Sequence, residues 1–182
     1  MQSIYDLNMK MATDMLAEKG QKSYRAKQLF QWLYRKRVGS FQEMTDMPAS
    51  LLEELAQEYS IEPVKEITRQ VAKDGTTKYL FQLADGSSVE TVLMHFHFGE
   101  SLCVTSQLGC NMGCTFCASG LLKKQRDLTA GEIVGQVMFV QKELDKIGKR
   151  VDNVVIMGTG EPFDNYDNVM RFCEIINSDL GL

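Results

Sequence analysis

The sequence predicts an α/β protein in which a small helical module and a β meander precede alternating strands and helices. Up to about Ile61, apolar side chains recur at helical spacing. From about Pro63 to Phe98, apolar and polar side chains alternate, as in strands with one buried face. From Leu102 onward, two apolar strand-like runs alternate with two amphipathic helical runs. This last pattern indicates βαβ units around a parallel sheet.

The N-terminal part contains two amphipathic helical runs, one within residues 23–37 and one opened by Pro48. Apolar residues of the first run fall on one helix face: Ala26, Leu29, Phe30, Leu33 and Tyr34. Residues 1–40 carry eight Lys/Arg against three Asp/Glu, a local charge of +5 in a chain of net charge −4. A phosphate-facing surface that includes Trp32 is one interpretation. Charge alone favours an ordinary solvated helix face, and helical spacing favours Trp32 as a core residue.

Three strands with tight turns are expected next, within residues 64–72, 77–83 and 88–96. Asp74-Gly75 and Asp85-Gly86 are turn signals between them. A further strand, Leu102 to Leu108, leads into a cysteine-rich segment, and Thr129 with Glu132 forms a capping box that predicts a helix start. The apolar run 151–158 is the next strand, and 168–176 the next helix. Chemistry in such folds lies in loops after the carboxyl ends of strands.

Cys110, Cys114 and Cys117 form a C-x-x-x-C-x-x-C run directly after the strand that ends at Leu108. A [4Fe–4S] cluster normally takes four cysteines, so three would leave one iron open. S-adenosylmethionine can bind such an iron and be cleaved reductively to a carbon radical. With the aromatic Phe116 before the third cysteine, the loop resembles the radical S-adenosylmethionine (SAM) superfamily.

Other features of the sequence agree with an intracellular metal protein. An odd number of cysteines, five, is unlike a secreted disulfide framework, and neither a signal peptide nor a membrane-spanning run is evident. We therefore expect a cytoplasmic protein without a membrane partner. A zinc site remains an alternative; it would need a fourth ligand, and His95 and His97 are the only histidines.

Gly158-Thr-Gly160-Glu161-Pro162 follows the second strand of the βαβ region. Glycines let the backbone approach a ligand closely, and the Glu161 carboxylate can accept hydrogen bonds from an ammonium group such as that of a methionine moiety. Alone, such a turn is more often a simple strand-to-helix connection. One βαβ unit after the three-cysteine loop, it matches the position of the Gly-Gly-Glu-type motif of radical SAM enzymes, which assigns Gly160 and Glu161 to the cofactor.

Four segments together resemble the N-terminal half of the RlmN family: SSVETVLMHF, SLCVTSQLGCNMGCTFCASG, LTAGEIVGQV and VVIMGTGEPFDNYDNV. The resemblance implies a truncated radical SAM partial (β/α) barrel (98–182) behind a helical accessory domain (1–62) and a β extension (63–97). It also implies methylation of adenine C2 in 23S ribosomal RNA and in transfer RNA, with a [4Fe–4S] cluster, SAM and an electron donor. Adenine C2 is electron-poor and does not attack a methyl cation donor, which is why a radical route is needed.

The same resemblance assigns two further residues. Glu90 matches the base that removes the C2 proton, and Cys103 matches the thiol that forms a disulfide with a methyl-carrying cysteine and releases the product. Without the resemblance, Glu90 is one exposed carboxylate on an alternating strand and Cys103 a small buried hydrophobe.

The chain departs from the family by its length. A complete (β/α)₈ barrel takes about 250 residues, and no residue here matches the methyl-carrying cysteine, because Cys173 falls on an amphipathic helix and is expected in the core. We expect a fragment that is inactive in methyl transfer alone. The alternatives are a Cfr-type adenine C8 methyltransferase or another radical SAM enzyme, a zinc-stabilised RNA-binding module, and an electron-transfer iron–sulfur protein. Gly-Glu-Pro at Pro162 favours RlmN over Cfr, and the last alternative gives no account of the glycine-rich turn.

Overall fold

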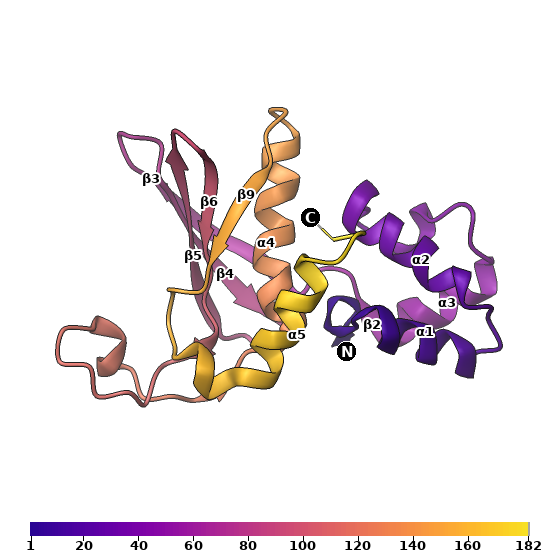
Figure 1. The fold of residues 1–182 in the computed structure, drawn as a ribbon, viewed down its shortest axis with the longest axis horizontal. Helices are drawn as coiled ribbons and strands as arrows, with labels where there is room; N and C mark the ends of the chain where they lie inside the picture. The colour runs from indigo at the N-terminus through magenta and orange to yellow at the C-terminus, as the bar shows by residue number, and fades with distance from the viewer. Residues whose placement is uncertain (182) are drawn as a thin grey trace.

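The computed structural model describes residues 1–181 and has a helical module on one side and a mixed sheet with two helices on the other (Figure 1). The α/β fold class predicted from the sequence is confirmed. The third predicted segment, 98–182, extends one residue beyond the described part. None of the described helices is both long and apolar enough to cross a membrane.

The two ends of the helical module pair with each other. Its helices are α1 (Met9–Glu18), α2 (Tyr24–Phe30), which continues as a π-helical segment (Gln31–Lys36), and α3 (Ala49–Glu58). Short strands β1 (Gln2–Ser3) and β2 (Tyr59–Ser60) pair in parallel and bring residues 2–3 beside 59–60. The module therefore begins and ends at the same place, next to the sheet.

Trp32 belongs to the core of this module. Its ring is buried, its indole Nε1 donates to Asp46 Oδ1 at 2.6 Å, and Lys36 Nζ lies 3.2 Å from the ring centroid. A buried and covered indole is not free to stack on a base, so the structure agrees with the core interpretation of Trp32.

One five-stranded sheet carries the rest of the fold, in the order β3-β4-β5-β6-β9. Its strands are β3 (Val64–Val71), β4 (Thr77–Leu83), β5 (Ser88–Phe96), β6 (Gly99–Cys103) and β9 (Val151–Val155). Neighbours from β3 to β6 are antiparallel, whereas β6 and β9 are parallel. The predicted meander is thus continuous with the first strand of the βαβ region.

Helix α4 (Ala130–Asp145) packs on one face of this sheet and contacts α5 (Tyr166–Ile176). The capping box predicted at its start is present: Thr129 Oγ1 accepts from the Glu132 amide, and Glu132 Oε2 accepts from the Thr129 amide. Inward side chains of the strands, such as Val89, Leu93 and Leu102, are buried beneath α4. Within residues 1–181, no helix covers the opposite face (Figure 1).

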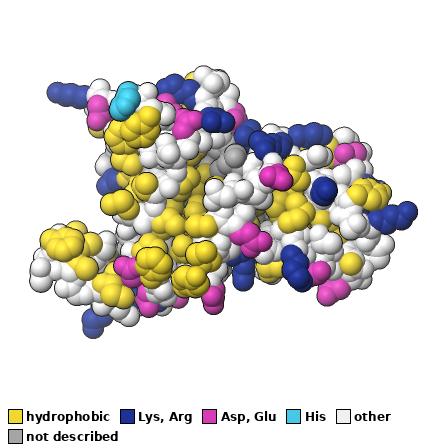
Figure 2. All heavy atoms as spheres, viewed as in Figure 1, with side chains coloured by type: hydrophobic (Ala, Val, Ile, Leu, Met, Phe, Trp, Pro, Cys, Tyr) yellow, Lys and Arg dark blue, Asp and Glu magenta, His cyan; other side chains and the backbone are white. Residues whose placement is uncertain are grey.

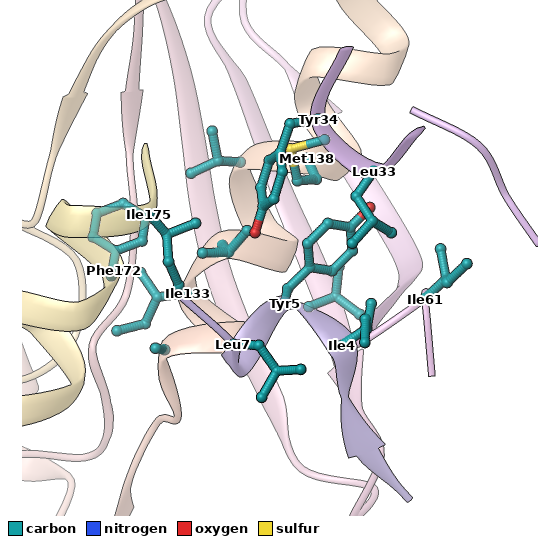
Figure 3. Close-up of a cluster of buried hydrophobic side chains, with 14 of the residues drawn as sticks. Ile4, Tyr5, Leu7, Leu33, Tyr34, Ile61, Ile133, Met138, Phe172 and Ile175 are labelled. Carbon is teal, nitrogen blue, oxygen red and sulfur yellow. The ribbon is translucent and has the colours of Figure 1, made fainter. Parts of the chain in front are cut away.

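The helical module meets the sheet domain at the start of α4. Figure 3 shows Tyr5, Tyr34 and Leu33 packed beside Met138 and Ile133 of α4. Asp6 Oδ1 accepts from the backbone amide of Gly131 at 2.6 Å, in the first turn of α4, where a carboxylate is favoured by the exposed amide groups. The two parts therefore share one hydrophobic core.

The single strand predicted from Leu102 to Leu108 is wrong. Strand β6 ends at Cys103, and β7 (Gln107–Leu108) pairs with the short β8 (Arg126–Asp127) instead. The backbone leaves the main sheet because the amides of Ser106 and Gln107 both donate to Thr159 O at 3.1 Å, in the turn that follows β9. The apolar pattern could not reveal that Ser106 and Gln107 have a hydrogen-bond partner 53 and 52 positions away in the sequence.

Candidate functional site

The site is built where β6 and β9 end. Because these strands are parallel, with Cys103 opposite Val155, their carboxyl ends lie side by side. The cysteine-containing segment 104–129 and the turn 156–165 therefore start from adjacent positions. Exposed hydrophobic side chains gather around both, over the projecting loop and the start of α5 (Figure 2); they are Phe116, Leu121, Met157, Phe163 and Tyr166.

The glycine-rich turn lies directly against the segment that leads to the cysteines. A Cβ on Gly158 would stand 2.6 Å from Thr105 Oγ1, and one on Gly160 would stand 2.6 Å from Gln107 Cβ. Gly160 also has a φ of +113°, which side chains of L-residues rarely allow. Both glycines are therefore required for the close approach of the two segments.

Glu161 ends this turn and is half-buried. Its backbone amide donates to Gln107 Oε1 at 2.8 Å, and its carboxylate Oε1 accepts from the Phe163 amide at 3.0 Å. The second bond caps the 3₁₀ helix Pro162–Asn165. Among residues 1–181 only Oε1 of this carboxylate is hydrogen-bonded, which leaves Oε2 available to an ammonium ligand.

The cysteine loop has a fixed stem and an exposed tip. Cys110 N donates to Leu122 O at 2.8 Å and Gln125 N donates to Leu108 O at 2.7 Å, so the stem closes like a hairpin. Gly109 lies in this stem with a φ of +78°. Cys110 is buried, whereas Cys114 and Cys117 are exposed beyond it.

Ser119 beside Cys117 favours its thiolate form. Hydrogen bonds from the Ser119 side chain and backbone lower the pKa of the Cys117 thiol below its usual value. Thiolates are the form that binds metal. Yet within the described part of the chain no three His, Cys, Asp or Glu side chains are grouped as a metal site. The structure brings Cys110, Cys114 and Cys117 into one loop without gathering their sulfurs.

The two histidines lie at the other end of the sheet. His95 is near the β5–β6 turn, where its Nε2 is 3.0 Å from Gly75 O and its Nδ1 contacts Glu100. His97 is in the same turn. The cysteine loop follows the far end of β6, so neither histidine completes a zinc site with it here.

Glu90 and Cys103 face the same uncovered side of the sheet. Cys103 is paired with Val92, and Glu90 is two residues from Val92 on β5, so the three side chains share a face. Glu90 is exposed and its Oε1 lies 2.9 Å from Lys78 Nζ. Cys103 is partly buried, and this burial raises the pKa of its thiol.

A cavity of about 190 Å³ joins Glu90 to the cysteine loop and the glycine-rich turn. Its walls include Glu90, Thr105, Gly109, Leu122 and Thr159. Thr105 Oγ1 donates to Glu90 O at 2.7 Å, which holds this part of β5 to the segment after β6. Cys103 does not line this cavity. The structure therefore places Glu90, the loop stem and the turn around one cavity, and Cys103 outside it.

Cys173 is separate from this group. It lies on α5, is partly buried against the hydrophobic core, and burial raises the pKa of its thiol. This position agrees with the expectation of a core residue.

Sequence reasoning missed the buried amides of the site. Gln136 on α4 has no exposed surface; its Oε1 accepts from Thr91 Oγ1 at 2.8 Å and Thr105 N at 2.9 Å, and its Nε2 donates to Thr105 O at 3.0 Å. Gln107 is equally buried. The sequence did contain one signal for them: each is a polar amide within an otherwise apolar strand or helix face. A buried amide at such a position requires a hydrogen-bond partner.

Two family descriptions match separate parts of the chain. Residues 2–61 match the ribosomal RNA large subunit methyltransferase N-terminal domain, and residues 104–181 match the radical SAM superfamily.

Relatives match the chain over its whole length. It is 56% identical to a protein of Streptococcus suis named "Probable dual-specificity RNA methyltransferase RlmN", over 99% of this chain and 49% of the relative. A protein of Enterococcus faecalis with the same name is 55% identical over 100% of this chain and 51% of the relative. The crystal structure of a radical SAM methyltransferase from Sphaerobacter thermophilus superposes with a TM-score of 0.92 at 38% identity, covering 100% of this chain and 53% of that one. The chain thus spans about half the length of the relatives it matches.

Proposed function

The chain corresponds over its full length to the N-terminal half of the RlmN family, and from this premise we propose that it forms part of a radical SAM enzyme that methylates C2 of adenine in 23S ribosomal RNA and in transfer RNA. The observation that carries the proposal is the junction of the cysteine loop with the glycine-rich turn through Thr159 O. That junction lies at the carboxyl ends of two parallel strands, where such folds place their chemistry.

Cys110, Cys114 and Cys117 would hold a [4Fe–4S] cluster. When bound, the cluster supplies the electron and the open iron that reductive cleavage of SAM requires. The donor set fits the group, because three thiols leave one iron without a protein ligand. Their sulfurs are not gathered in the structure, so the loop tip must close as the cluster binds. The lowered pKa of the Cys117 thiol favours this step, because the thiolate is the ligand.

The glycine-rich turn would bind the methionine moiety of SAM. The free Glu161 Oε2 can accept from its ammonium group, and Gly160 brings the backbone within reach. The short distance between this turn and the loop stem supports the assignment, because a single SAM must contact both.

Glu90 would act as the base that takes the C2 proton. It lines the cavity beside the loop stem, and Lys78 pairs with its carboxylate. Cys103, one strand away on the same face, would attack the sulfur of the methyl-carrying cysteine and form a disulfide as the bond from that sulfur to the transferred carbon breaks. The electron pair of the broken bond goes to that carbon, which takes a proton as the product leaves. No residue of this chain matches that second cysteine.

We retain the predicted division into 1–62, 63–97 and 98–182, with RNA contacts in the first part. The support is chemical: the exposed basic side chains of this part are Lys10, Lys22, Lys27, Arg35 and Lys36, and Lys and Arg side chains are the groups that neutralise RNA phosphates. The partners are then ribosomal and transfer RNA, together with an electron donor for the cluster.

Anaerobic reconstitution tests the proposal. The chain, incubated with iron and sulfide and reduced with dithionite, should give a paramagnetic cluster signal that changes when SAM is added. Cys117→Ser should lose the signal, whereas Cys173→Ser, which alters the partly buried cysteine of α5 instead, should retain it. Binding of one zinc without iron would instead favour the RNA-binding module, and a cluster indifferent to SAM would favour electron transfer.

A further inference from the structure

The side chain of Gln107 forms hydrogen bonds both to the cysteine loop and to the segment of the glycine-rich turn. Its Nε2 donates to Asp127 Oδ1 at 2.7 Å and to Asp164 Oδ2 at 3.1 Å. Its Oε1 accepts from the Glu161 amide at 2.8 Å. Asp127 belongs to the return arm of the cysteine loop, whereas Glu161 and Asp164 follow β9. One amide group thus contacts both sides of the site.

Lys124 reinforces the same connection from outside. Its Nζ lies 2.9 Å from Asp127 Oδ1 and 2.7 Å from Asp164 Oδ2. The two carboxylates are therefore bridged twice, by the buried amide of Gln107 and by the ammonium group of Lys124. Without these bridges, Asp127 and Asp164 would repel each other and separate the loop stem from the turn.

The contact at Gln107 also leaves little room for adjustment. It is fully buried, its backbone amide donates to Thr159 O, and the Cα of Gly160 packs against it so closely that a Cβ there would stand 2.9 Å from Gln107 N. A side chain with every polar atom bonded and no exposed surface holds its neighbours in one arrangement.

We propose that Gln107 is a positioning residue for SAM, fixing the Gly160–Glu161 turn at a set distance from the stem of the cysteine loop so that one SAM can reach both. This inference rests on the proposed function. Gln107 need not touch the ligand or the cluster; it acts through Glu161, Asp127 and Asp164. Groups that orient the ligands of a metal site in this way commonly change affinity by about 10-fold to 100-fold when removed.

The test compares Gln107→Leu with Gln141→Leu in the whole chain. Gln141 is a matched control: it is also buried, accepts from Val151 N at 2.8 Å and donates to Asp145 Oδ1 at 2.8 Å, but lies at the opposite end of β9. Gln107→Glu is a second variant, which keeps an acceptor for Glu161 N but cannot donate to either aspartate and repels both.

Three measurements are needed. Hydrogen exchange of the cluster-free chain should be faster over residues 158–165 in both Gln107 variants, and unchanged there in Gln141→Leu. Iron content after reconstitution should stay near that of the wild type, because the thiols are intact. The SAM dissociation constant, read from the cluster signal, should rise about 10-fold in the Gln107 variants alone.

The outcomes separate the two proposals. Unchanged exchange, an unchanged dissociation constant in the Gln107 variants, or an equal rise in Gln141→Leu would overturn the positioning role. Should Gln107→Leu fail to fold, Gln107→Glu decides by the same criteria. A wild-type cluster that ignores SAM would refute the proposed function together with this inference, whereas a responsive wild type with equally responsive variants would refute the inference only.

Discussion

Replacing Gly109 by alanine should open the stem of the cysteine loop. Gly109 has a φ of +78°, and a Cβ there would stand 2.2 Å from the backbone oxygen of Lys123 on the return arm. An ordinary contact at this position begins near 3.4 Å. The obstacle is backbone, so a side-chain rotation cannot relieve it and the two arms must separate.

Gly86→Ala is the matched control for the magnitude. Gly86 has a φ of +85°, but nothing lies within 4 Å of its would-be Cβ. Both substitutions therefore carry the cost of a positive φ, about 1–2 kcal/mol. Only Gly109→Ala also breaks the two stem hydrogen bonds, Cys110 N to Leu122 O and Gln125 N to Leu108 O. Each of these hydrogen bonds contributes about 1 kcal/mol to stability. We therefore expect Gly109→Ala, which opens the stem, to be more destabilising than Gly86→Ala by about 2 kcal/mol.

Urea unfolding, hydrogen exchange and iron loading measure the difference. Because a loop can open without unfolding the domain, part of the loss will appear as faster exchange over residues 108–125 rather than as a lower free energy of unfolding. Iron bound after anaerobic reconstitution should fall in Gly109→Ala and stay at the wild-type level in Gly86→Ala. If the two variants lose equal stability and bind equal iron, the stem geometry argued above is incorrect.

Two further predictions concern titratable groups. In the metal-free chain, alkylation near pH 7.5 should be faster at Cys117 than at Cys103. Hydrogen bonds from Ser119 lower the pKa of the Cys117 thiol, whereas burial raises the pKa of the Cys103 thiol. Mass spectrometry of the modified peptides at several pH values checks this order, and equal rates would contradict it. Hydrogen bonds from Ser87 come first among the causes that lower the pKa of Asp85 to about 2. The charged form is therefore favoured in the folded state, so wild type should exceed Asp85→Asn in stability near neutral pH, by under about 1 kcal/mol because the group is exposed. The difference should vanish as the pH falls from about 4 to 2, and a difference in urea midpoints that persists at pH 2 would refute the assignment.

Sequence patterns predicted the elements of the fold well where the signal is local. The capping box at Thr129 and Glu132 set the start of α4, and the turn signals at Gly75 and Gly86 divided the meander. Alternation also indicated that the strands have one buried face. It could not reveal that β5 joins β6 in one sheet, because strand pairing depends on contacts between residues distant in sequence.

The sequence proposes residues for the candidate site but does not place them relative to one another. Spacing identified the three cysteines and the turn at Gly160, because both motifs are contiguous. That Glu90 and Cys103 face the same side follows only from the pairing of Cys103 with Val92. The role of Gln107 was invisible for the same reason, since its partners Asp127 and Glu161 are 20 and 54 positions away.

Hydrogen bonds of buried side chains hold one part of the site in place, whereas the tip of the cysteine loop is exposed. Buried amides bond the stem, the turn and β5 together: Gln136 and Gln107 as described, and Asn165, whose Nδ2 donates to Ser106 O and Leu128 O at 2.8 Å. Within residues 1–181, the buried side-chain atoms left without a partner belong to Tyr5, Tyr34 and Arg37, outside this network. The thiols of Cys114 and Cys117 at the loop tip are exposed, and the hydrogen bonds to the Cys117 thiol come from Ser119 in the tip itself. Ordering of the tip is therefore the step we expect cluster binding to drive, whereas the turn that we propose for SAM is already held in place by its own hydrogen bonds.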